Sequence, residues 1–229
     1  MKSLVIVGEG QTEEAFVTRV LRAPFVESNV LVDPRLVGGR GGALKGQRVL
    51  RYLRNTLRER PDTVVTTFFD LYRLPSDFPG VEESRGVAAP LDRASAIEAA
   101  LKAAVVEVSG CREDRFVPYI QPHEFEALLF SDVAKFGEVE KEWQPRVAQL
   151  QRVRDAVPTP EHINHGADTH PSARLATLSP KFQKTLHGIL LAEEIGLATI
   201  RTQCAHFDSW IAALLALGSN EDEGADPQQ

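Results

Sequence analysis

Apolar runs and amphipathic stretches alternate along the chain, an order typical of α/β proteins. Short runs rich in β-branched and aromatic residues predict four strands, at residues 4–7, 30–37, 63–69 and 116–121. Apolar positions at helical spacing predict helices over 13–27, 44–60, 94–108, 133–157, 181–195 and 207–217, with a further one beginning near residue 124. We expect an α/β fold with a mostly parallel sheet flanked by helices and a helical C-terminal part.

Prolines and a capping residue refine these elements. Pro34 and Pro118 each remove a donor from a strand ladder, which predicts a bend or an edge position at Pro34 and an edge position for the strand with Pro118. Thr12 is a suitable N-cap for the first helix. Glu13 and Glu14 would then complement the positive end of that helix, which accounts for both acids without catalysis.

The character of the chain changes after residue 131, and an acidic segment ends it. We expect an α/β core at 1–131, a helical extension packed on it at 132–217, and a disordered tail at 218–229. The net charge is −6, and the tail carries four of these negative charges, leaving −2 for the rest. A nearly neutral body does not exclude nucleic acid as a partner, because divalent cations bound to acids reverse the local sign.

The composition is that of an ordinary globular protein, with 43% hydrophobic and 25% charged residues. No apolar run is long enough to cross a bilayer, and the first residues lack the pattern of a secretory signal. Cys111 and Cys204 stand far apart and in no metal-binding or redox pattern. We therefore expect a cytoplasmic protein with two reduced thiols.

Acidic residues follow three of the predicted strands. Glu9 stands after the first strand, Asp70 ends the third, and Glu124 and Glu126 follow the fourth. The carboxyl ends of parallel strands meet at one edge of a sheet, so these acids are expected to converge. Hard oxygen ligands suit Mg²⁺ or Mn²⁺, which can support phosphodiester cleavage. Stabilisation by a helix N-terminus is the alternative explanation for the last two acids.

Glycines, a cation and histidines are further candidates for phosphate or substrate contacts. Gly8 and Gly10 allow the backbone to approach a ligand closely. Arg40 stands among four glycines, in a loop that either surrounds a phosphate or is a mobile connector. His123 and His206 are candidates for phosphate contact, and a hydrogen-bonded structural role is their alternative.

Two weaker patterns leave alternatives open. One face of the helix at 44–60 is basic, which suits either a nucleic-acid backbone or a solvated surface. His162, His165 and His170 have a spacing that can bind zinc, but they stand in a segment that contains glycine and proline and no cysteine.

The order of these motifs resembles a known family. The resemblance to the Toprim domain of topoisomerases, bacterial primases and OLD-family nucleases rests on Gly8-Glu9-Gly10-Gln11-Thr12-Glu13 and Phe68-Phe69-Asp70. The runs at 119–130, 171–175 and 204–207 are similar to a bacterial domain-of-unknown-function family grouped with Toprim-like proteins. The resemblance extends nearly to the tail, and it implies a Toprim/Rossmann-like fold for residues 1–131.

The resemblance implies roles for individual residues. Glu9 matches the Toprim glutamate, which binds metal or transfers protons, and Asp70 matches the first acid of an Asp-x-Asp motif. Tyr72 stands where the second aspartate is expected. Glu126 resembles the later acid that OLD-like nucleases add to their metal cluster, and Asp77 is a second candidate for the missing ligand.

Arg174 or Lys181 would supply the cation that stabilises the transferred phosphate. We therefore predict a Mg²⁺- or Mn²⁺-dependent nuclease or related phosphodiester-processing protein that acts on nucleic acid. The resemblance implies work in bacterial defence or DNA repair beside an ABC-type ATPase. The missing aspartate leaves open a catalytically silent binding module, and a small-molecule phosphohydrolase is the third possibility.

Overall fold

The computed structural model describes residues 1–38, 44–163, 170–178 and 182–219. The strands are β1 (Lys2–Gly8), β2 (Val30–Leu36), β3 (Val64–Asp70), β4 (Phe116–Val117) and β5 (Ile120–Gln121). The α-helices are α1 (Gln11–Phe16), α2 (Arg22–Glu27), α3 (Gly46–Glu59), α4 (Pro90–Ser109), α5 (Lys135–Val139), α6 (Val147–Asp155), α7 (Pro171–Leu178), α8 (Ile189–Ile195), α9 (Leu197–Gln203) and α10 (Ala205–Leu215). The 3₁₀-helices span Leu71–Arg73, Glu113–Arg115, Phe125–Ser131, Lys141–Arg146 and Pro160–His162, and π-helical turns span Val17–Leu21 and Lys184–Gly188.

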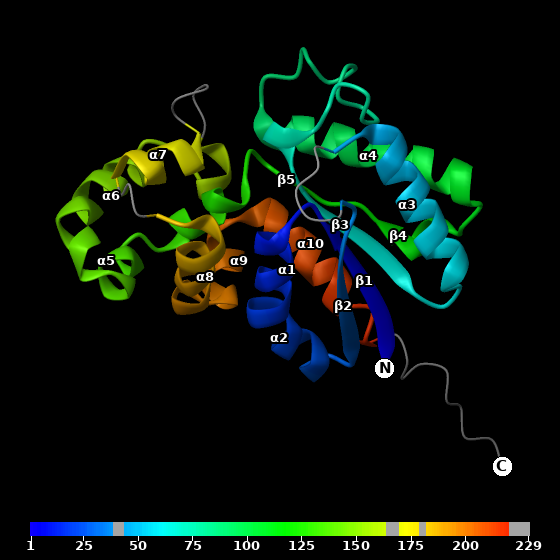
Figure 1. Ribbon diagram of the computed structural model, residues 1–229, viewed down its shortest axis with the longest axis horizontal. Coiled ribbons are helices and arrows are strands. Elements are labelled where there is room, and N and C mark those ends of the chain that lie inside the picture. Colours follow the sequence, from blue (N-terminus) through cyan, green and yellow to red (C-terminus); the bar gives the residue numbers. More distant parts are fainter. Residues whose placement is uncertain (39–43, 164–169, 179–181, 220–229) are drawn as a thin grey trace.

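The five strands form a parallel sheet in the order β2-β1-β3-β4, with β5 also paired to β3 (Figure 1). The expected α/β class is confirmed. β2 and β4 end the sheet, as Pro34 and Pro118 predict. The chain leaves β1 toward β2 and returns on its other side as β3, so the strand order reverses between β1 and β3. Ligands of open α/β sheets bind outside the carboxyl ends of the strands at such a reversal.

Alternate residues of β1 face two different hydrophobic cores. Leu4 and Ile6 belong to a core that includes residues of α1, α2 and α8–α10. Val5 and Val7 belong to a second core, with residues of α3 and α4. The two helix sets lie on opposite sides of the sheet (Figure 1). Both faces of the sheet are therefore covered, as nearly continuous apolar strands require.

The fourth predicted strand is split into β4 and β5. Pro118 interrupts it, and side chains of β3 replace the missing ladder bonds. The Thr67 hydroxyl donates to the Tyr119 carbonyl and accepts the Tyr119 N–H, both at 2.9 Å. The Thr66 hydroxyl accepts a hydrogen bond from the Trp210 indole at 2.8 Å. Since the Trp210 ring also stacks on Tyr119 at 4.3 Å, α10 is fixed against this edge of the sheet.

The C-terminal helices share the first of these cores with the sheet. The ring of Phe16 on α1 lies 5.3 Å from that of Phe125 and 6.1 Å from that of Phe207 on α10. α5, α6 and α7 form a lobe at the left of Figure 1. α7 and α9 lie where no helix was predicted; α9 follows Gly196, whose φ of 80° ends α8. From residue 220 the predicted tail lies outside the described residues.

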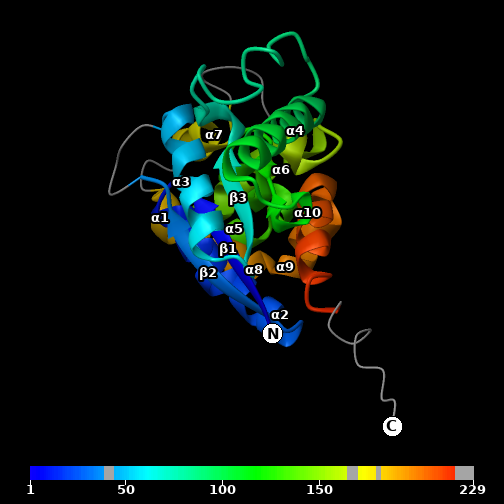
Figure 2. The same cartoon turned by 90° about the vertical axis from the view of Figure 1, so that its right-hand side faces the viewer.

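The segment at 74–89, between the 3₁₀ turn Leu71–Arg73 and α4, contains no helix or strand. It extends beyond the carboxyl ends of the strands in both views (Figures 1 and 2). Cys111 and Cys204 are free thiols. Within the described ranges, no helix combines the length and the apolar character that a membrane crossing needs.

Candidate active site at the carboxyl rim of the sheet

β1 delivers Glu9 to the carboxyl rim of the sheet, beside the start of α1. A Cβ at Gly8 would lie 2.8 Å from the Cβ of Glu13, so the packing of α1 on the strand requires glycine there. Gly10 is the N-cap of α1, and its N–H donates to Glu13 Oε2 at 2.8 Å. The prediction of Thr12 as the cap is wrong, because Thr12 lies buried inside the helix.

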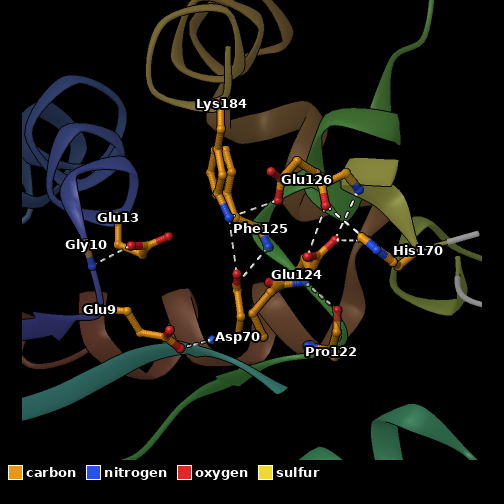
Figure 3. Close-up of polar contacts among 12 residues, drawn as sticks. Glu9, Gly10, Glu13, Asp70, Pro122, Glu124, Phe125, Glu126, His170 and Lys184 are labelled. Carbon is orange, nitrogen blue, oxygen red and sulfur yellow. Dashed lines mark hydrogen bonds and ion pairs between the residues drawn. The ribbon is translucent and has the colours of Figure 1, made fainter. Parts of the chain in front are cut away.

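Hydrogen bonds connect the ends of the strands. Glu9 Oε1 accepts the backbone N–H of Asp70 at 2.8 Å, and Asp70 Oδ1 accepts the backbone N–H of Phe125 at 2.8 Å (Figure 3). Phe125 begins the 3₁₀-helix after β5, and this places Glu126 on the same rim. The fold therefore brings together acids that are far apart in the sequence.

The ammonium of Lys184 lies between two of these acids. Its Nζ is 3.2 Å from Asp70 Oδ2 and 3.0 Å from Glu126 Oε2 (Figure 3). Lys184 belongs to the π-helical turn that precedes α8. Glu126 is fully buried, and neither of its oxygens has a hydrogen bond within the described structure. Lys184 therefore compensates the charge of Glu126 at Oε2, whereas the buried Oε1 has no polar partner in the described structure.

Burial and mutual repulsion raise the pKa of three carboxyls. Burial first and the charge of Asp70 second raise the pKa of Glu9 to about 8 and that of Glu13 to about 7. Burial raises the pKa of Glu126 to about 7, although the charge of Lys184 opposes this shift. Burial alone would lower the pKa of Lys184, but the carboxylates around it raise it instead. The ammonium is therefore charged, and it does not balance all the acids around it.

This set of acids suits a hard divalent cation in kind and in charge. Oε1 of Glu126, which has no polar partner in the described structure, marks where compensation of the buried carboxylate is incomplete. Among the residues that the structure describes, no three Asp, Glu, His or Cys side chains are close enough to hold one metal ion. Lys184 takes the place between Asp70 and Glu126, so ligation of a cation there requires the side chains to rearrange.

Glu124 is turned toward other partners (Figure 3). Its Oε2 lies 2.9 Å from Nδ1 of His170 and accepts the backbone N–H of Ser172 at 3.1 Å, and its Oε1 accepts the Ser172 hydroxyl at 3.1 Å. Burial alone would raise the pKa of Glu124, but these hydrogen bonds outweigh it and lower the pKa. Glu124 therefore anchors the start of α7 at the rim.

A cleft of about 1020 Å³ opens beside the carboxylates. Its lining includes Glu9, Glu13, Lys184 and Arg73, which follows Asp70 on the first 3₁₀ turn. The charge of Arg73 partly opposes the rise in the pKa of Glu9. The volume is at the upper end of the range for small-molecule sites, so the cleft has room for an extended ligand.

The family model that matches the chain covers residues 8–215 and describes a domain of unknown function, DUF4276. The chain belongs to this family. The matched region contains every carboxylate of the rim, and it confirms the expected membership in a domain family of unknown function. No curated protein and no solved structure matches the chain. The likeness of this DUF4276 domain to Toprim domains and OLD-family nucleases stays a prediction.

Two of the predicted candidates make contacts away from the acids at the rim. Both oxygens of Asp77 accept the backbone N–H of Gly46, at 3.1 and 3.0 Å, and thus cap α3. Asp77 therefore does not replace the missing acid. Nε2 of His206 lies 2.9 Å from Glu98 Oε1, and its ring stacks on Tyr119 at 5.3 Å. These contacts join α10 to α4.

The other candidates lie close to the rim or outside the described residues. His123 has a φ of 65° in the turn after β5, and its carbonyl accepts the Tyr72 N–H at 3.1 Å. Histidine is among the residues that tolerate this left-handed conformation best. Arg174 lies on α7. Arg40 and Lys181 lie outside the described residues.

Two residues of the cluster were not predicted. Glu13 was assigned to the helix alone, although the spacing of Gly10 and Glu13 is that of a capping box, whose acid turns back toward the strand end. Lys184 lies near the start of a predicted helix. No local pattern separates it from Lys181, because only the packing of its turn and of α8 against α1 and the 3₁₀-helix Phe125–Ser131 directs Lys184 inward.

Proposed function

We propose that this DUF4276 domain hydrolyses phosphodiester bonds of nucleic acid with Mg²⁺ or Mn²⁺. One observation carries the proposal: the buried acids Glu13, Asp70 and Glu126 and the partly buried Glu9 meet where the strand order reverses, beside an open cleft. Burial of unmatched carboxylates costs folding free energy, and strongly perturbed carboxyl pKa values in a cleft are typical of functional sites. The resemblance to Toprim domains supports the same assignment.

Each residue of the cluster has a role in this proposal. Glu9, Asp70 and Glu126 would hold the cation once Lys184 has moved aside, and the bound cation would activate water and stabilise the oxygens of the phosphodiester. Glu9 is also a candidate for proton transfer, because it lines the cleft at the end of β1. Lys184 and Arg73 bring positive charge to the side of the cleft, where the substrate phosphate binds.

Titration calorimetry with Mn²⁺ and cleavage assays on single-stranded and duplex DNA and RNA test the proposal. We expect wild type to bind Mn²⁺ and to cleave at least one of these substrates. Asp70→Asn and Glu126→Gln should lose both properties. Glu113→Gln, which changes an exposed acid far from the rim, should retain them. A wild-type protein that neither binds Mn²⁺ nor cleaves any substrate contradicts the proposal.

A second candidate is a binding module without catalysis. It is favoured by Lys184, which already bridges Asp70 and Glu126, and by Tyr72, which stands where the second acid of the Toprim motif is expected. Nucleic-acid binding that is unchanged by Mn²⁺ and by Asp70→Asn would support this candidate over the hydrolase.

The resemblance also implies partners and a location. We propose that the domain acts in bacterial defence or DNA repair with an ABC-type ATPase, in the cytoplasm, where its two free thiols stay reduced. Copurification of an ATPase with the tagged protein from its native host tests the partner. Its absence after crosslinking would remove this part of the proposal.

A further inference from the structure

Tyr72 is the exposed aromatic residue of the rim. Among the described residues, the other aromatic side chains are buried or partly buried, whereas 52% of the surface of Tyr72 is exposed. It lies two residues after Asp70, on the 3₁₀ turn that also carries Arg73. A large ring thus lies in solvent next to buried carboxylates, and burial of apolar surface does not explain this position.

The ring of Tyr72 is held in place from one side. It stacks on the imidazole of His170, with the ring centroids 5.0 Å apart and the planes 25° from parallel. His170 is oriented by Glu124, which is itself nearly inaccessible to solvent and fixed by Ser172. The backbone N–H of Tyr72 donates to the His123 carbonyl at 3.1 Å. The two rings therefore form a preorganised aromatic platform.

We infer that the Tyr72–His170 platform stacks an unpaired nucleobase of a single-stranded substrate. Proteins that bind single strands combine aromatic rings for the bases with cations for the backbone. Here Tyr72 offers the ring, and the next residue, Arg73, lines the cleft together with Lys184. The bases of a duplex cover one another's faces, so the platform selects strands with unpaired bases. This inference rests on the proposed function for the position of the phosphate, and it adds the class of substrate.

Binding measured without hydrolysis tests the platform. Fluorescence anisotropy in EDTA at low salt compares labelled single-stranded DNA, single-stranded RNA and a blunt duplex. We expect Tyr72→Ala to weaken single-strand binding by roughly tenfold and Tyr72→Phe to change it by less than about twofold, because stacking needs only the ring. Leu31→Ala, which removes an exposed apolar side chain on β2, is the matched control and should change nothing. The DNA and RNA arms show which sugar the site accepts.

A spectroscopic signal separates stacking from a merely structural role. An aminopurine base in the strand should lose fluorescence on binding to wild type and to Tyr72→Phe, but not on binding to Tyr72→Ala. Equal single-strand affinities of wild type and Tyr72→Ala, an equal loss of duplex binding, or no binding by wild type with or without Mn²⁺ overturns the inference. If Tyr72 controls binding but no substrate is cleaved, the hydrolase proposal fails and the platform stands. If Tyr72→Ala cleaves as wild type does, the platform fails and the hydrolase proposal stands.

Discussion

The substitution Lys184→Met tests whether one ammonium compensates the negative charge of the acids at the rim. Methionine keeps the length and most of the volume of the side chain but removes its charge. Lys184 contacts Asp70 at 3.2 Å and Glu126 at 3.0 Å, and its own side chain is 24% exposed. Removal of one partner from a buried ion pair typically costs 3–5 kcal/mol, because the remaining charge stays buried without compensation. Partial exposure places Lys184 at the lower end, at about 3 kcal/mol.

Urea unfolding of the metal-free protein at pH 7.5 and pH 5 measures this loss. A loss of about 3 kcal/mol in the free energy of unfolding corresponds to a fall in Tm of about 6–12 °C for a chain of this size. The loss should shrink at pH 5, because Glu13 and Glu126 have pKa values of about 7 and are neutral there. The double variant Lys184→Met/Glu126→Gln should recover part of the stability.

Lys135→Met is the matched control. Lys135 forms an exposed i,i+3 ion pair with Glu138, and such pairs contribute little to stability. If Lys184→Met lowers the free energy of unfolding as little as this control does, or by the same amount at both pH values, then Lys184 is not a buried counter-ion. The electrostatic account of the rim would then be refuted.

Two further predictions concern pH. The pKa of Glu9 is raised from its ordinary value of 4.5 to about 8, so its ionisation destabilises the metal-free fold as the pH rises from about 4.5 through 8. The amide oxygen of Glu9→Gln still accepts the Asp70 N–H. This variant should therefore be more stable than wild type at pH 8.5, by on the order of 2 kcal/mol, and as stable as wild type at pH 4.5. Lower stability of the variant in urea at both pH values would disprove this. Burial alone would lower the pKa of His206, but the hydrogen bond and the charge of Glu98 raise it, so the stabilisation by this pair is complete below about pH 6.5 and is lost as the pH rises through the raised pKa. The stability difference between wild type and His206→Gln should accordingly be larger at pH 6 than at pH 8.5, and a constant difference would count against the ion pair.

Local patterns predicted most of the sheet and its carboxyl rim. The apolar runs that end at Gly8 and at Asp70 are buried strands in the structure, and the prolines located the edges. The carboxyl ends of parallel strands meet at one edge of a sheet, so the acids after the strands were expected to converge there. For this reason Glu9, Asp70 and Glu126 were identifiable before any contact was known.

The remainder depends on packing, which a local pattern does not encode. Pro118 divides one predicted strand into two, and the division is tolerated because threonine hydroxyls of β3 supply the bonds. α7 escaped prediction because its first turn is held by Glu124, a residue from a distant part of the chain. Lys184 shows the same limit, since its position is set by the packing of its turn against α1 and the 3₁₀-helix Phe125–Ser131, which are distant in sequence.

The ion pair between Asp70 and Lys184 joins residues 114 positions apart, and this has a consequence for synthesis of the chain. When β1 and β3 have left the ribosome, the acids of the rim are already present, but the lysine between them is not. The charges of the β-sheet layer are therefore balanced only when Lys184 arrives, and the core around Phe125 and Phe207 closes only when α10 follows. Long-range contacts of this kind slow folding and leave apolar surface open meanwhile. The site therefore matures late, although its first acid follows the first strand of the sheet.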